Sequence, residues 1–239
     1  DISSQIINDE GNSDFLRLFW NLQELTTDEA AWTWQNDAGV RGLKEMAWSS
    51  NNALVAGLYY RAFYQITLCN DFIRQAAEDK VGSRGISGAD AENIKKYKAE
   101  ARFLRAFQYW VLMDLYGNPP FVDENSPVAT GIPPQIARAD LFTYIETELK
   151  AIETEVVAAR SNEYGRADQG AVWALLARLY LNAAVYTGQE RYTDAITYCK
   201  KIMDAGYTLH PSYRNLTIAD NHLNTDENIF MIAYDARYT

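Results

Sequence analysis

Residues 168–186 read DQGAVWALLARLYLNAAVY, and this stretch decides the fold. Its apolar residues recur every three or four positions, which is the period of one face of an α-helix. Asp168 is of a residue type that caps helix N-termini, and Gly188 breaks the pattern at the other end. A second stretch with the same period covers roughly residues 192–205 and stops before Gly206. Two such helices joined by a short break predict an antiparallel helix pair.

The pattern Trp173-x2-Leu176-Ala177-x2-Tyr180 resembles the first helix of a tetratricopeptide (TPR) repeat, W-x2-L-G-x2-Y, with Ala in place of Gly. The small residue allows a partner helix to approach, and the larger side chains fill the groove. However, residues 183–188 lengthen the pair beyond the standard repeat, and an ordinary amphipathic helix hairpin explains the two helices equally well. We therefore interpret the pair as TPR-like.

The same helical periodicity recurs in the rest of the chain, at residues 53–78, at 91–116 and after residue 138. Residues 117–137 hold five of the six prolines and form a connection. Residues 229–234 are rich in β-forming types and predict a short β segment near the C-terminus. The expected fold class is mainly all-α, with TPR-like antiparallel helix pairs in an α/α superhelix and irregular loops.

Three segments are expected along the chain. Residues 1–50 form an irregular, loop-rich segment with a candidate ligand loop, and residues 51–206 form the TPR-like helical scaffold. Residues 207–239 begin a C-terminal segment that we expect to be truncated, because an apolar strand without a partner lies close to the end of the chain. The abrupt start at Asp1 favours the same interpretation.

Composition excludes several classes of protein. The net charge is −10, which repels nucleic acid, and no cluster of Lys and Arg offsets it. No stretch approaches the roughly 18 apolar residues that span a bilayer. The two cysteines, Cys69 and Cys199, do not make a disulfide framework, and both are expected to be small buried residues in helices.

Residues 98–122, KAEARFLRAFQYWVLMDLYGNPPFV, closely resemble the hallmark segment of the SusD/RagB family. Further segments match that family in the same order along nearly the whole chain. They are residues 27–29 (TDE), 165–167 (GRA) leading into 174–181 (ALLARLYL), 192–195 (YTDA) leading into 206–209 (GYTL), and 224–230 (NTDENIF).

The resemblance implies a function. Members of this family are lipoproteins on the surface of glycan-scavenging Gram-negative bacteria, where they bind oligosaccharides or polysaccharides above a TonB-dependent, SusC-like outer-membrane transporter. None is known as an enzyme, and no cofactor or metal is implied. The expected location is therefore the cell outer membrane, with the membrane reached only through a lipid anchor that this sequence does not contain. The anchor's cysteine is expected before Asp1, and a long C-terminal portion after Thr239.

The best candidate ligand site lies in the loop that begins at Trp32. Its expected carbohydrate-binding residues are Trp32, Trp34, Asn36 and Arg41. The apolar faces of sugar rings stack on indole, while amide and guanidinium groups bond to the hydroxyls, and binding residues concentrate on loops held by a rigid scaffold. The alternative is that one or both tryptophans fill the helix layer. The match to the family in this loop is regional, so no individual family position is carried over.

Other conspicuous residues are interpreted structurally. Trp20, Trp110 and Trp173 lie on apolar helix faces and are expected in the core. The charged residues at 100, 102 and 105 point to different sides of one helix, so we expect ion pairs between helices and not catalysis. Residues 220–227 alternate oxygen donors, but they lack the Gly and the terminal Glu of a calcium loop.

Two other function classes stay open at this point. A TPR-like scaffold that binds only a protein partner, without a glycan site of its own, is the main alternative. An α-helical carbohydrate-active enzyme is the third, although the chain carries none of the common nucleophile, phosphate, dinucleotide or zinc motifs.

Overall fold

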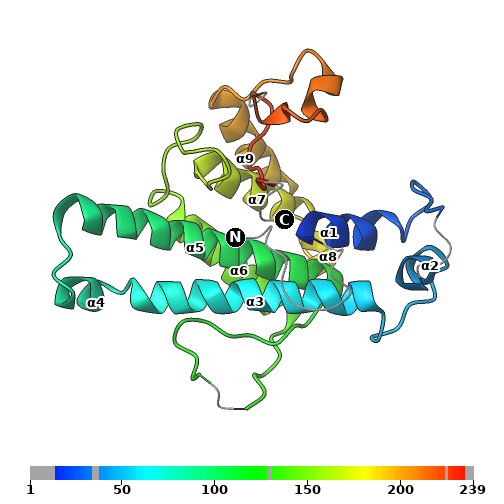
Figure 1. Ribbon diagram of the computed structural model, residues 1–239, viewed down its shortest axis with the longest axis horizontal. Helices are drawn as coiled ribbons and strands as arrows, with labels where there is room; N and C mark the ends of the chain where they lie inside the picture. The colour runs from blue at the N-terminus through cyan, green and yellow to red at the C-terminus, as the bar shows by residue number, and fades with distance from the viewer. Residues whose placement is uncertain (1–13, 34–37, 129–130, 224–225, 235–239) are drawn as a thin grey trace. The chain divides into compact units, whose positions relative to one another are not determined.

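The computed structural model describes residues 14–33, 38–128, 131–223 and 226–234 (Figure 1). Their regular secondary structure is almost entirely helical. The elements are α1 (Phe15–Glu24), α2 (Ala38–Lys44), α3 (Ala53–Gln75), α4 (Glu78–Ser83), α5 (Gly88–Tyr116), α6 (Arg138–Ile152), α7 (Gln169–Leu181), α8 (Ala183–Thr187), α9 (Tyr192–Asp204) and the 3-10 helices η1 (Tyr213–Leu216) and η2 (Asn221–Leu223). The expected all-α class is confirmed.

The expected β segment near the C-terminus is wrong for the part of it that the structure describes. Residues 229–234 form no strand there, because a strand needs a neighbour to take its N–H and C=O groups. Phe230 instead packs its ring on Phe103 and Phe107 of α5. Within the described residues, the one isolated β-bridge pairs Pro120 with Gln135.

The chain divides into two compact units, and each is described by itself. The first runs to Gln65 and takes in the chain from Ile232, and the second runs from Ile66 to Met231. The boundary falls inside α3. The three-part division expected from the sequence stays a prediction, although its first segment does contain α1 and α2.

The first unit packs α1 and α2 through short apolar faces. Asp14 caps α1 by accepting a hydrogen bond from the backbone N–H of Arg17 at 2.9 Å. The buried residues of these two helices include Leu18, Leu22, Val40 and Leu43. The expectation that Trp20 lies in this core is wrong. Its side chain is 46% exposed, because it lies on the side of α1 opposite to Leu18 and Leu22.

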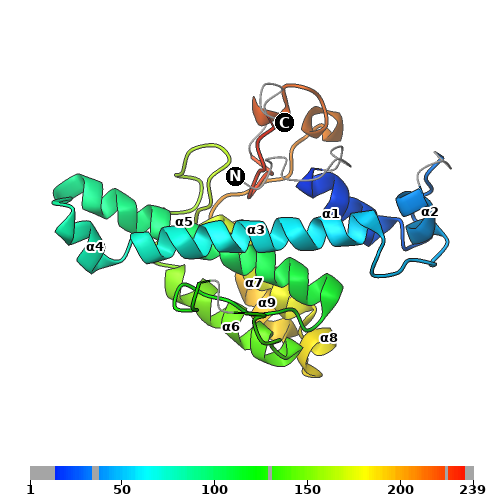
Figure 2. The same ribbon diagram turned by 60° about the horizontal axis from the view of Figure 1, so that its bottom comes forward.

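The second unit is a stack of helices in which α5 packs on α6, α6 on α7, and α7 on α9 (Figures 1 and 2). Tyr180 of α7 stacks on Tyr198 of α9 with ring centroids 5.7 Å apart, and Lys201 lies over the Trp173 ring. Later residues of α9 therefore meet earlier residues of α7, which makes the pair antiparallel. The closer likeness to a TPR stays an interpretation.

Local sequence signals set the helix ends in this unit. Asp168 accepts from the N–H of Ala171 at 3.1 Å, so the expected N-cap of α7 is confirmed. Gly117 follows α5 with a φ of 77°, a left-handed value that favours glycine and stops the helix. Trp110 is buried as expected, and Trp173 is half-buried with its Nε1 donating to Glu153.

The charged residues of α5 join helices, as expected. Arg102 and Arg105 both donate to Glu148 on α6, and Glu100 accepts from Arg166. By contrast, the expectation for Cys199 is wrong. Cys69 is buried, but Cys199 is exposed on the outer side of α9.

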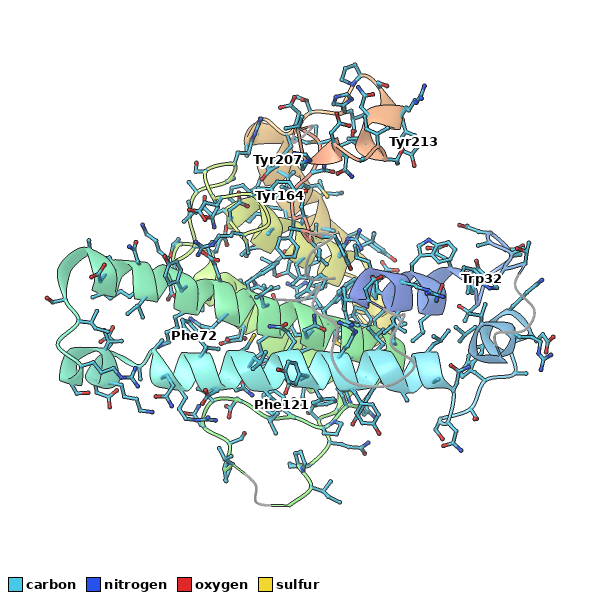
Figure 3. All side chains as sticks on the ribbon, in the orientation of Figure 1. Trp32, Phe72, Phe121, Tyr164, Tyr207 and Tyr213 are labelled. Carbon is cyan, nitrogen blue, oxygen red and sulfur yellow. The ribbon has the colours of Figure 1, made fainter. Side chains whose placement is uncertain are left out.

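The proline-bearing connection between α5 and α6 is held to the helices at its base. The Tyr109 hydroxyl donates to the carbonyl of Val122 and accepts from its N–H, at 2.6 and 2.8 Å. Asn70 donates to the same carbonyl. The Phe121 ring, labelled in Figure 3, packs on Tyr109 and Tyr144. The start of the connection is therefore fixed to α3, α5 and α6.

Candidate functional site

The candidate site is built on the end of α1 and the turn that follows it. The hydroxyl of Thr27 donates to the carbonyl of Glu24 at 2.7 Å and accepts from the N–H of Glu29 at 3.2 Å. This turn directs the chain toward Trp32, whose side chain is half-buried (Figure 3). The guanidinium of Arg17 lies over the Trp32 ring, 5.8 Å from its centroid. One face of the indole is thus covered by a cation.

The structure describes two of the four expected binding residues. Trp34 and Asn36 lie outside the described residues. Arg41 is exposed on α2, where the buried Val40 and Leu43 set the direction in which it points. The side-chain amide of Asn52 donates to the carbonyl of Gly39 at 2.9 Å and holds the start of this helix. Arg17 is one of the neighbours of Trp32 in the structure.

Polar groups continue the surface from Arg17 toward the start of α1. The carboxylate of Asp14 accepts a hydrogen bond from the backbone N–H of Arg17 and another, at 2.8 Å, from the hydroxyl of Tyr234. Burial, together with the nearby carboxylate of Asp14, raises the pKa of Tyr234 to about 12. The hydroxyl therefore keeps its proton and acts as a donor at neutral pH.

The half-buried Arg61 lies near the same groups. Partial burial lowers the pKa of Arg61, while the nearby carboxylate of Asp14 opposes that change. Arg61 is therefore within electrostatic reach of the cap of α1. Together with Trp32 and Arg17, these side chains offer an aromatic face, hydrogen-bond donors and a carboxylate acceptor. That combination suits a ligand with both apolar faces and many hydroxyl groups.

Sequence reasoning did not identify Arg17, Asp14 or Tyr234 as parts of this surface. A signal for Asp14 existed, because an Asp directly before an apolar helical run is an N-cap pattern. Once Asp14 is recognised as the cap, Arg17 is the residue whose backbone N–H is expected to donate to it. No local signal connects Tyr234 with Asp14, because 220 residues separate them.

Two further features of the described residues concern other kinds of site. None of the described helices combines the length and apolar character that crossing a membrane requires. The described His, Cys, Asp and Glu side chains also form no group of three placed to hold a metal ion.

Comparison with known proteins identifies the family. Residues 6–181 match a SusD-like family model described as "Starch-binding associating with outer membrane". The starch-binding protein SusD of Bacteroides thetaiotaomicron is 40% identical over 216 residues, which cover 90% of this chain and 37% of that protein. The resemblance seen in residues 98–122 is thereby confirmed.

Solved structures agree. A SusD-like carbohydrate binding protein from Bacteroides fragilis superposes with a TM-score of 0.66 at 25% identity, covering 80% of this chain and 36% of that one. Surface glycan-binding protein A from Bacteroides uniformis gives a TM-score of 0.74 at 24% identity, over 95% and 49% of the two chains. This chain spans less than half the length of each of these relatives. The chain belongs to the SusD-like family.

Proposed function

We propose that this chain captures oligosaccharides for an outer-membrane nutrient-uptake system, binding them on the surface around Trp32. Membership of a family described as starch-binding and associating with the outer membrane supports this role. The name of the relative from B. thetaiotaomicron makes α-glucans the first ligands to test. The single structural observation that carries the site is the half-buried Trp32 with Arg17 stacked on one of its faces.

In this proposal the sugar binds on the face of the indole opposite Arg17. A sugar ring stacks its apolar C–H face on the ring, and the surrounding donors and acceptors exchange water for sugar hydroxyls. Arg17 supports the indole from the other side, so less side-chain freedom is lost when the sugar arrives. We propose that Trp34, Asn36 and Arg41 complete the surface, with Trp34 as a second stacking residue.

The wider role is part of the same proposal. The bound glycan would pass to a TonB-dependent, SusC-like transporter, and the protein would be held at the cell surface by a lipid anchor outside this sequence. It would act as a binding protein and not as an enzyme. The motifs shared with the SusD-like family and the family membership support the role of a binding protein. The transporter is the partner that the family resemblance implies.

Isothermal titration with maltoheptaose and a panel of other neutral oligosaccharides tests the site. We expect Trp32→Ala and Trp34→Ala each to weaken binding at least about tenfold, which is about 1.4 kcal/mol. Trp20→Ala is the matched control, since Trp20 is an exposed tryptophan in the same unit, on α1. We expect it to leave the affinity unchanged.

Three other results of these experiments would contradict the proposal. Binding that survives both Trp32→Ala and Trp34→Ala would place the site elsewhere. If no oligosaccharide in the panel binds, the alternative of a TPR-like protein-interaction scaffold without its own glycan site is favoured. Release of reducing sugar above background would show an enzyme.

A further inference from the structure

Helix α9 has two apolar faces, and one of them is exposed. Ala195 and Tyr198 are buried, and the Tyr198 ring stacks on α7. A different face carries a row of apolar side chains, which we call the α9 seam. It consists of Tyr192, Ile196, Cys199 and Met203, all exposed.

The spacing of the α9 seam is that of a helix-packing surface. Its residues follow one another by four, three and four positions, so they form one narrow stripe along the helix. The stripe is about 17 Å long at 1.5 Å per residue. Ile196 is 55% exposed and Met203 is 70% exposed. The exposed Thr193 and Lys200 flank it, as polar residues flank the contact face between two packed helices.

The order of packing in the second unit explains why such a stripe would exist. Helix α5 packs on α6 and also on α7, and α7 packs on α8 and on α9. Helices α5, α6 and α7 thus each contact the next helix and the next but one. Helix α9 is the last α-helix among the described residues, and only the short η1 and η2 follow it there. The final helix of such a stack normally presents a polar outer face, whereas α9 exposes the apolar α9 seam beside its polar residues.

We propose that the α9 seam is covered by a further amphipathic helix of the same polypeptide, from a part of the full-length protein beyond these 239 residues. The relatives provide the length for it, because this chain matches only 37% of one and 49% of another. The covering helix would carry apolar residues at matching spacing and an acidic residue facing Lys200.

A second copy or a separate protein fits the seam less well. A stable interface between separate chains uses roughly 20–30 residues on each side, whereas the seam has four. Binding between separate molecules also loses translational and rotational freedom, which a small contact does not offset. A helix tethered in the same chain does not lose that freedom, so a short seam is sufficient for it.

The two cysteines provide the test. In the complete natural protein, maleimide labelling followed by peptide mass spectrometry measures Cys199 against the buried Cys69 and against the urea-unfolded protein. We expect Cys199 to be labelled about 100-fold more slowly in the folded complete protein than in urea, because only local opening exposes it. In the 239-residue chain alone, Cys199 should be labelled quickly while Cys69 stays protected.

Variants on α9 separate the possible causes of protection. In the complete protein, Ile196→Glu should raise the labelling rate of Cys199 at least about tenfold, since a charge in an apolar contact favours opening. Thr197→Glu, an exposed position of the same helix off the seam, should not change the rate. If Ile196→Glu fails to fold, Met203→Gln makes the same comparison with a milder change.

Rapid labelling of Cys199 in the complete protein would overturn the proposal. Protection that appears only at high protein concentration would assign the seam to a second copy, and protection that needs an added protein would assign it to a partner. Both results would also overturn it. None of them affects the glycan site around Trp32, which is tested independently.

Discussion

Arg105, in the middle of α5, donates to Glu148 of α6 at 2.9 Å, although the arginine side chain is almost entirely buried. Its other terminal nitrogen donates to Asn70 of α3 at 2.7 Å and to Glu124 in the α5–α6 connection at 2.5 Å. Glu148 also receives two hydrogen bonds from Arg102. One buried cation therefore joins two helices and the connection to α5.

Removing the carboxylate of Glu148 should destabilise the fold strongly. Glu148→Gln leaves a buried guanidinium with one charge partner fewer, and breaking a buried pair in this way costs about 3 kcal/mol. Urea unfolding followed by circular dichroism measures the change. Asp71→Asn is the control, because Asp71 pairs with Arg74 at a largely exposed position, and we expect no measurable change there. Equal effects of the two variants would contradict the special role of the buried pair.

Acid should destabilise the protein through the same carboxylate. Burial alone would raise the pKa of Glu148, but the hydrogen bonds and charges of Arg102 and Arg105 outweigh it, so the folded-state pKa is lowered. A carboxyl with a lowered folded-state pKa stabilises the fold above its unfolded pKa, about 4.3 for Glu, and loses that contribution as the pH falls further. The pKa values of Glu146 and Glu153 are lowered as well.

The free energy of unfolding should therefore be nearly constant from about pH 6 to 8 and fall below about pH 4. Urea unfolding at a series of pH values measures it. In Glu148→Gln the fall should be shallower, because one of the titrating groups is gone. A fall of the same steepness in both proteins would show that other groups dominate.

The N-cap of α7 should depend on an acceptor oxygen more than on a charge. Asp168 accepts from the N–H of Ala171 and from the N–H of Arg160, at 3.1 and 2.7 Å, while burial raises the pKa of its carboxyl. Asp168→Ala should destabilise by about 1–2 kcal/mol, the usual range for a lost cap. Asp168→Asn should lose much less, since the amide oxygen caps equally well. Thermal unfolding distinguishes the two, and equal losses would show that the charge is needed.

Gly170 allows the chain after α9 to pack on the first turn of α7. A Cβ added at this position would lie 2.9 Å from Cζ of Tyr207 and closer still to its hydroxyl, so the tyrosine would have to move (Figure 3). Gly170→Ala should destabilise by about 1–3 kcal/mol through overpacking. Gly82→Ala is the matched control, because a Cβ there meets nothing within 4 Å and Ala favours a helix over Gly. In the Tyr207→Ala background the loss at Gly170 should disappear.

Sequence reasoning located the helices well because each helix has a long apolar period and chemically distinct ends. Asp168 before α7 and Gly117 after α5 show this, since both act through their immediate neighbours in the chain. It was wrong for Trp20 and Cys199. Both lie in apolar helical patterns, but a pattern shows only that one face is apolar, not whether another element covers it.

The candidate site shows the same division. Aromatic and amide residues in one loop are visible in the sequence, so Trp32 and Arg41 could be proposed without a structure. That Arg17 stacks on Trp32, and that Tyr234 reaches Asp14, depends on how the chain returns over long separations. Local sequence preferences do not predict contacts of this kind.

The sequence by itself determined the family, the all-α class and the approximate extent of the main helices, because these depend on periodicity and on short motifs read along the chain. Only the tertiary structure decided which apolar faces are covered, which charges meet and which groups surround Trp32. The physical reason is that burial and ion pairing depend on distances between residues far apart in the chain. Those distances are set when the helices pack, as Arg105 and Glu148 show.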